Sequence, residues 1–213
     1  MNKLEFFILL NILAIIYSIL NYLELIRYVN IRVNSNNYFL KKFRKMKKYS
    51  KVERIVLIID TDVKRINKLK PCINSLLDQT IRVDEIALNL KDGDLEKVDP
   101  ILHKILNVYE VENFDNKICQ NIIPTLYREN DNDTIIILLK DNIIYPKNFI
   151  LHMVEKSVKN PHNVIKSNIE NVFLFKPEFF SIKSLDDVCN EKWLQNNLRN
   201  NISNIKKQRF YKF

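Results

Sequence analysis

The sequence predicts an α/β fold, in which a mainly parallel sheet is sandwiched by helices, preceded by one N-terminal transmembrane helix. Three observations support this prediction. Short apolar, β-branched runs alternate with helical patterns from residue 53 to 200, which is typical of a parallel sheet. The run 133–146 passes from a buried strand directly into the polar triplet Lys140-Asp141-Asn142. Residues 6–26 are apolar over a length that can cross a bilayer.

Residues 1–26 are predicted to form the membrane anchor. The apolar run of about 20 residues has the length of a transmembrane helix. Its apolar side chains occupy every face of the helix, whereas an amphipathic helix packed on the domain would have one stripe. No cleavage pattern of small residues follows, which argues against a signal peptide.

Residues 27–52 are predicted to be a basic linker, helical in part. Much of the formal net charge of +9 is concentrated there, in Arg27, Arg32, Lys41, Lys42, Arg44, Lys45, Lys47 and Lys48. By the positive-inside rule, this charge places the C-terminal domain on the cytosolic side of a single-pass protein. Basic residues beside an apolar span bind anionic head groups, so the expected partner is membrane lipid and not nucleic acid.

The remaining residues, 53–213, are predicted to form the globular domain. Apolar runs predict strands at 54–60, 85–90, 108–111, 134–139 and 172–175. Helical patterns lie between them, at 66–79, 101–106, 116–128, 146–159 and 187–198. Pro146 stands in the first turn of its helix, where proline is favoured, and Pro124 limits the regularity of the helix 116–128.

Composition excludes several kinds of site. Gly93 is the only glycine, so neither a P-loop nor a Rossmann dinucleotide fingerprint can be present. The three cysteines form no CxxC pair, and the three histidines have no ligand spacing. Neither a zinc site nor a disulfide framework is therefore expected.

Several segments, in order, resemble glycosyltransferases of the GT-A fold, family 2-like group. They are Cys72-Ile73-Asn74-Ser75-Leu76-Leu77-Asp78-Gln79-Thr80 followed by Asp84-Glu85-Ile86, then 115–126, then 134–146, then Val172-Phe173-Leu174-Phe175-Lys176-Pro177-Glu178-Phe179-Phe180, and finally Asp186-Asp187-Val188. The resemblance covers roughly residues 53–200. It implies a nucleotide-diphospho-sugar transferase fold, a nucleotide-sugar donor such as a UDP-sugar, an acceptor that the sequence does not identify, and a divalent cation (Mn or Mg) if the protein is active.

The chain departs from this family where the metal is expected. Lys140 and Asn142 replace the outer acids of an acidic triplet and leave only Asp141. Carboxylates supply most of the charge that holds a hard divalent cation, so metal binding should be weakened. A lysine can itself neutralise a diphosphate as a point charge, which makes donor binding without metal conceivable. We therefore expect weak or absent activity, as in a pseudoenzyme, with no cofactor if activity is lost.

The resemblance also assigns roles by position. Thr61 and Arg65 would face the nucleotide, Asp115 its base or ribose, Asp141 the metal, and Asp186 or Asp187 would be the general base. Each has a plain alternative. The first three are equally compatible with solvent-exposed loops, Asp141 with the dipole of the following helix, and Asp186 with an N-cap.

Two functions follow from these observations. The first is a membrane-anchored glycosyltransferase-like protein that transfers a sugar from a nucleotide-sugar donor, if it is active. The alternative is a non-catalytic, membrane-anchored interaction or scaffold module built on the same fold, because a fold does not fix a function.

Overall fold

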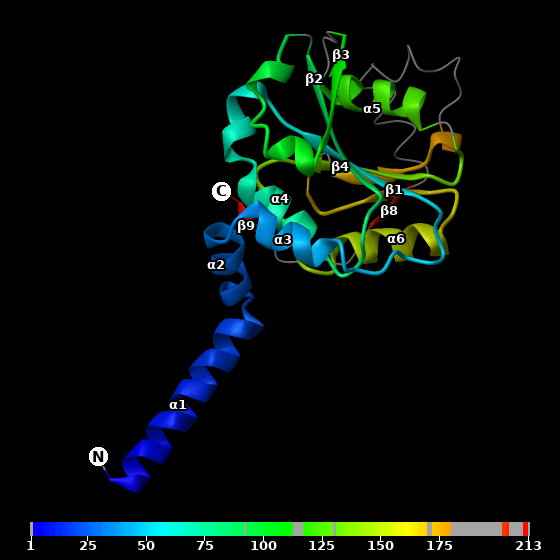
Figure 1. The fold of residues 1–213 in the computed structure, drawn as a ribbon. Coiled ribbons are helices and arrows are strands. Elements are labelled where there is room, and N and C mark those ends of the chain that lie inside the picture. Colours follow the sequence, from blue (N-terminus) through cyan, green and yellow to red (C-terminus); the bar gives the residue numbers. More distant parts are fainter. Residues whose placement is uncertain are drawn as a thin grey trace.

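A helix-covered sheet carries one long helix that stands away from it (Figure 1). The structure is a computed structural model, and it describes residues 2–91, 93–112, 117–129, 131–169, 172–179, 202–204 and 211–212. The predicted helix 187–198 lies outside these residues.

The main sheet has seven strands in the order β3-β2-β1-β4-β7-β6-β8. Strands β1, β2, β3 and β4 are parallel, β7 runs antiparallel to β4 and β6, and β8 is parallel to β6. A second, two-stranded sheet pairs β5 with β9. The strands are β1 (Ile55–Asp60), β2 (Glu85–Lys91), β3 (Asn107–Val111), β4 (Ile135–Lys140), β5 (Ile143–Ile144), β6 (Val164–Lys166), β7 (Phe173–Phe175), β8 (Ile202–Asn204) and β9 (Tyr211–Lys212).

Helices cover both faces of the sheet. The α-helices are α1 (Lys3–Tyr22), α2 (Leu25–Val33), α3 (Asn36–Phe43), α4 (Lys70–Leu77), α5 (Lys117–Arg128) and α6 (Phe149–Lys159). Single turns and a longer segment of 3₁₀ helix are η1 (Val63–Lys68), η2 (Leu95–Lys97), η3 (Leu102–Lys104) and η4 (Pro177–Phe179).

The central strands are apolar on both faces because each face packs against helices. Leu57 and Ile137 belong to the larger core cluster with residues of α4 and α6. Ile58 and Leu138 point the other way and pack with Ile122 of α5. This alternation explains why β1 and β4 read as continuous hydrophobic runs.

The structure confirms an α/β fold with a mostly parallel sheet and corrects several details. The helix expected at 66–79 is divided into η1 and α4, because Pro71 occupies the first turn of a new helix. The segment expected as a helix at 101–106 forms only the turn η3. The helix expected from Pro146 begins at Phe149, after a turn in which Phe149 N donates to Pro146 O.

The segment 27–52, expected to be a basic linker, contains α2 and α3, which pack on the domain. Ile31 of α2 and Phe39 of α3 have no exposed surface and belong to the main core. Asn74 of α4 donates to the backbone oxygens of Ile31 and Asn34. The beginning of the folded domain therefore lies at α2.

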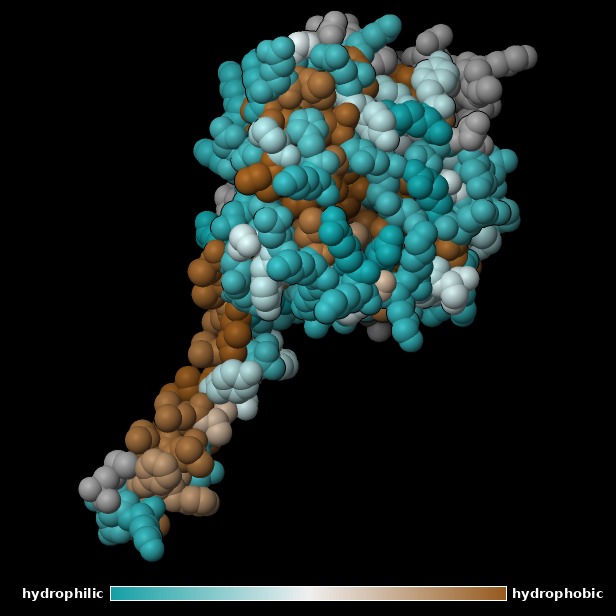
Figure 2. All heavy atoms as spheres, in the orientation of Figure 1, coloured by the Kyte–Doolittle hydropathy of each residue, from teal (hydrophilic) through white to brown (hydrophobic). Residues whose placement is uncertain are grey.

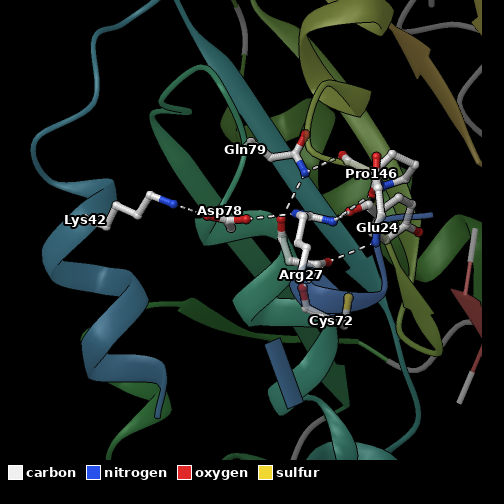
Figure 3. Close-up of polar contacts among 9 residues, drawn as sticks. Glu24, Arg27, Lys42, Cys72, Asp78, Gln79 and Pro146 are labelled. Atoms are coloured by element: carbon white, nitrogen blue, oxygen red, sulfur yellow. Dashed lines mark hydrogen bonds and ion pairs between the residues drawn. The ribbon is translucent and has the colours of Figure 1, made fainter. Parts of the chain in front are cut away.

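Arg27 links α2 to the centre of the domain. Its Nε donates to Asp78 Oδ2 over 2.8 Å, and its Nη1 donates to the backbone oxygen of Tyr145 over 3.0 Å. Lys42 of α3 forms an ion pair with the same Asp78, which is only 5% exposed (Figure 3). Arg27 and Lys42, two of the basic residues expected to bind lipid, therefore form ion pairs within the protein.

Helix α1 is the only helix among the described residues that is long and apolar enough to cross a membrane. It has 20 residues and a mean hydropathy of 2.0, and none of its residues is buried. Length and composition support an anchor, although a signal sequence near an N-terminus has the same properties. The helix ends at Tyr22, four residues before the predicted end of the anchor at Ile26.

Candidate functional site

The candidate site lies where β1 and β4 end. These strands are adjacent and parallel, and their last residues, Asp60 and Lys140, are partners in the register. The residues that follow each strand, Thr61 and Asp141, therefore leave the sheet at the same edge. The carboxyl edge of a parallel sheet is where ligands bind in open α/β folds.

Three of the predicted site residues are in direct contact. Asp141 Oδ2 accepts a hydrogen bond from Thr61 Oγ1 over 2.8 Å and another from Arg65 Nε over 2.7 Å. Arg65 is carried by η1, whose N-cap Asp62 accepts from Lys64 N. Asp141 is 8% exposed, whereas the Arg65 side chain is 36% exposed. The Asp141 carboxylate is thus nearly buried and paired, while the side chain of its partner Arg65 is partly exposed to solvent.

Tyr145 fixes the backbone beside Asp141. Its hydroxyl donates to Lys140 O over 3.0 Å and accepts from Lys140 N over 2.7 Å. Its own backbone N donates to Ser75 Oγ of α4 over 3.0 Å. Burial raises the pKa of the Tyr145 hydroxyl well above its ordinary value, so this group stays protonated and keeps its donor role. The Tyr145 side chain therefore both packs in the core and holds the backbone of Lys140.

Cys72 lies under the same turn. Its Sγ is 3.6 Å from Lys140 O, and the residue has no exposed surface. Burial raises the pKa of the Cys72 thiol, and the negative charge of Asp141 raises it further. A thiol in this state is a poor nucleophile and metal ligand, so Cys72 has a packing role.

Asp60 is a second carboxylate at this edge that the sequence analysis did not select. Its Oδ1 accepts from Asn121 Nδ2 of α5 over 3.0 Å. Its place in the sequence indicates such a role, because Asp60 is the only polar residue of the strand Ile55–Asp60 and stands at its end. Its partner in the register is Lys140, so the last residue of β1 and the last residue of β4 carry opposite charges at this edge.

This donor set does not fit a divalent cation. The described residues include no group of three His, Cys, Asp or Glu side chains that could hold a metal. Asp141 Oδ2 already accepts from two donors, one of them cationic. Manganese or magnesium needs several oxygen ligands, and carboxylates among them neutralise its positive charge. Lys140 is itself positively charged and would repel the metal ion.

The other predicted site residues cannot be placed. Asp115, Asp186 and Asp187 lie outside the described residues, so the roles expected for them, in binding nucleotide and as general base, stay predictions.

A pocket of about 270 Å³ lies at the opposite end of β4. Its lining includes Glu53, Asp133 and Ile135, which are near the beginnings of β1 and β4. It is therefore separate from the candidate site at the carboxyl edge of the same strands.

Comparison with solved structures identifies the fold. The chain is similar to S. aureus TarS 1-349, solved in complex with UDP, with a TM-score of 0.50 and 8% identity over 75% of this chain and 60% of that chain. It also matches 4-diphosphocytidyl-2C-methyl-D-erythritol synthase from Anaerococcus prevotii at a TM-score of 0.47 and 11% identity, over 73% of this chain and 90% of that one.

No family model and no curated protein matches the sequence. At 8% identity, the similarity to TarS shows the fold alone: a mostly parallel sheet flanked by helices, found there in a protein that holds UDP.

Proposed function

We propose that this protein is a membrane-anchored member of the nucleotide-sugar transferase class of folds that binds a nucleoside diphosphate or a UDP-sugar without a divalent cation. The resemblance to family 2-like GT-A glycosyltransferases, the shared fold with UDP-bound TarS and the apolar helix α1 support this proposal. Sugar transfer by this site is slow or absent. The domain faces the cytosol, as the basic residues after α1 favour.

One observation carries the proposal: Arg65 forms an ion pair with Asp141 at the edge where the ligand is expected. In a metal-dependent transferase, the carboxylate would hold a cation that neutralises the diphosphate. Here Arg65 neutralises the carboxylate, and its side chain is partly open to solvent. Arg65 and Lys140 are two cationic side chains at this edge, both partly exposed, so a diphosphate that competes with Asp141 for Arg65 would have two cationic partners without metal.

Calorimetry of the full chain in detergent micelles tests the proposal. We expect UDP and UDP-sugars to bind with the same affinity in EDTA and in MnCl₂. Arg65→Gln should weaken binding about tenfold to a hundredfold, since a charge-assisted contact is worth about 1.5–3 kcal/mol. Lys64→Gln, which removes the same charge from an exposed neighbour on η1, is the matched control and should bind normally.

Each other result has a defined meaning. Binding that requires manganese would contradict the metal-independent site. Equal losses in Arg65→Gln and Lys64→Gln would indicate unspecific attraction of an anion.

The second candidate is the non-catalytic interaction module. Its supporting observation is that Thr61, Arg65 and Asp141 satisfy one another, as residues of a purely structural turn would. Absence of any UDP or UDP-sugar binding to a folded wild-type chain would favour this module over the nucleotide-binding protein.

A further inference from the structure

The length of α1 fixes the level at which the chain leaves the bilayer. Its 20 residues, at about 1.5 Å of rise each, span about 30 Å, which is the thickness of the hydrocarbon core. A chain that enters at Lys3 therefore leaves the core near Tyr22. Helix α2, which begins at Leu25, starts at the level of the lipid head groups.

The backbone turns sharply at this level. Glu24, the N-cap of α2, has φ 57°, in the left-handed region that an ordinary residue rarely adopts. Helix α2 consequently turns away from the axis of α1 (Figure 1). An ion pair between Arg27 Nη1 and Glu24 Oε2, 3.7 Å long, joins this turn to α2.

Helix α2 has two apolar faces, and only one is covered. Ile31 is fully buried in the core, and Tyr28 packs against the same cluster. On the other face, Ile26, Val29 and Val33 are 37%, 57% and 72% exposed. Their spacing of three and four residues places them in one stripe. Hydrophobic atoms continue from α1 onto the adjoining part of the domain (Figure 2).

Exposed basic residues come after this stripe in the sequence, in α3 and directly after it. Lys41 in α3 and Arg44, Lys45 and Lys47 directly after it are exposed, and none forms an ion pair with another described residue. Lys42 and Lys48 differ, because they pair with Asp78 and Asp84. Tyr38, 52% exposed, adds an aromatic side chain of the kind enriched at membrane interfaces.

We propose that α2 and α3 form a second membrane contact, in which Ile26, Val29 and Val33 enter the head-group and acyl boundary and the free basic residues bind anionic lipid. The occupant of this surface is an anionic leaflet, because the surface is continuous with α1, carries complementary charge and lies at head-group level. An apolar helix face flanked by basic residues is typical of helices that lie in the interface. The inference depends on the membrane anchoring in the proposed function, and not on nucleotide binding.

This contact holds the candidate site at the membrane surface. Arg27 of α2 donates to the backbone oxygen of Tyr145, whose hydroxyl fixes Lys140. The turn that carries Asp141 is thus connected to the interfacial helix through two side chains. A docked α2 keeps this turn at a fixed height above the bilayer, whereas a simple tether would let the domain rotate freely.

Fluorescence of the full chain in lipid vesicles tests the contact. An environment-sensitive label is placed on Val29→Cys or Val33→Cys in a Cys189→Ser background, because Cys72 and Cys119 are buried. Tyr127→Cys provides the control, since Tyr127 is 68% exposed on α5. In vesicles of phosphatidylcholine and phosphatidylglycerol, spin-labelled lipids should quench labels 29 and 33 about twofold or more and leave label 127 unchanged.

Charge is tested in the same system. Changing Lys41, Lys45 and Lys47 to Gln should remove the part of the quenching that depends on phosphatidylglycerol, since each basic residue near the surface strengthens binding to an anionic leaflet about fivefold. The matched control changes Lys91, Lys104 and Lys159, which are exposed on other elements, to Gln and should behave like the parent.

The outcomes separate the two proposals. If alkaline extraction leaves the chain in the membrane while labels 29 and 33 remain as water-exposed as label 127, the docking surface is refuted and the anchor stands. If the chain is extracted, both the membrane anchor and the docking surface are refuted. A protein-concentration-dependent spectral change without lipid quenching would show that a second copy covers the stripe, which also refutes lipid docking. UDP binding, measured separately, is unaffected by each of these results.

Discussion

Arg65 Nε and Asp141 Oδ2 lie 2.7 Å apart, although 76 positions separate the two residues in the sequence. The parallel pairing of β1 with β4 makes this contact possible, because it brings the segments after both strands to one edge. The ion pair places a guanidinium where the resemblance implies a metal ion.

Removing this guanidinium should destabilise the fold. We expect Arg65→Met to lower the free energy of unfolding by about 1–2 kcal/mol, because Asp141 would lose a charge-assisted hydrogen bond at a poorly solvated position. The exposure of Arg65 keeps the loss below that of a fully buried pair. Urea denaturation in detergent measures it. A loss no greater than that of Lys64→Met would contradict a structural role for the pair.

The Tyr145 hydroxyl should contribute more than its ring contact alone. Tyr145→Phe keeps the aromatic ring but leaves Lys140 N and O without this partner, which should cost about 1–2 kcal/mol of unfolding free energy. Tyr127→Phe changes an exposed hydroxyl and should stay within about 0.5 kcal/mol of the parent. If the two variants are equally stable, the hydroxyl does not hold the turn.

Arg27 should control the attachment of α2. Arg27→Met removes one cation from Asp78 and the donor to Tyr145 O, while Lys42 still faces Asp78. We expect a loss of about 2 kcal/mol, which is less than for a buried charge left without any partner. Hydrogen exchange should accelerate in α2 more than in β1. Arg32→Met, an exposed change in the same helix, is the comparison, and similar exchange in both would argue against this attachment.

Cys72 should react slowly with thiol reagents at every pH at which the protein is folded. Its raised pKa means that the thiolate, the reactive form, does not accumulate as pH rises through the range in which an ordinary cysteine ionises. In a Cys189→Ser chain, labelling at residue 72, followed by mass spectrometry, should stay low from pH 7 to about 9 and become complete in urea. Rapid labelling that increases with pH in the native state would refute the burial.

The sequence predicts the centre of the fold well and its periphery poorly. The runs in β1 and β4 are apolar at consecutive positions, a pattern that requires burial on both faces, and this locates the edge at which Thr61, Arg65 and Asp141 meet. The antiparallel direction of β7 is not predictable from three apolar residues, because both directions bury them equally. The strands β5, β6, β8 and β9 were not predicted, because two or three residues carry too short a pattern, whereas β7 lies in the longer apolar run 172–175.

The docking of α2 and α3 was also beyond sequence analysis. Ile31 and Phe39 stand among polar and basic residues, and only the tertiary structure shows that they enter the core. Similarly, the basic residues near the anchor suggested lipid contacts as a group. The structure divides them, because Arg27, Lys42 and Lys48 pair with carboxylates of the domain.

Restoring the lost acids tests whether the candidate site is an altered metal site. Lys140→Asp with Asn142→Asp supplies two carboxylates beside Asp141 and removes the opposing ammonium. We expect the affinity for Mn²⁺ to rise about tenfold or more, since carboxylates provide most of the attraction for a hard cation. Calorimetry with MnCl₂ measures it. Lys91→Asp with Lys104→Gln, which changes the net charge equally at exposed positions, should leave the affinity unchanged.

The ion pair predicts a further dependence in this series. Asp141 remains engaged by Arg65 in the double variant, so only two of the three carboxylates can act fully. Adding Arg65→Gln should release Asp141 and raise Mn²⁺ affinity again, whereas Arg65→Gln alone should have little effect because two acids are still missing. This non-additivity is expected only if the three positions share one site. If the acid pair binds Mn²⁺ no better than its control, the three positions do not converge on one cation and the metal-site ancestry of this edge is refuted.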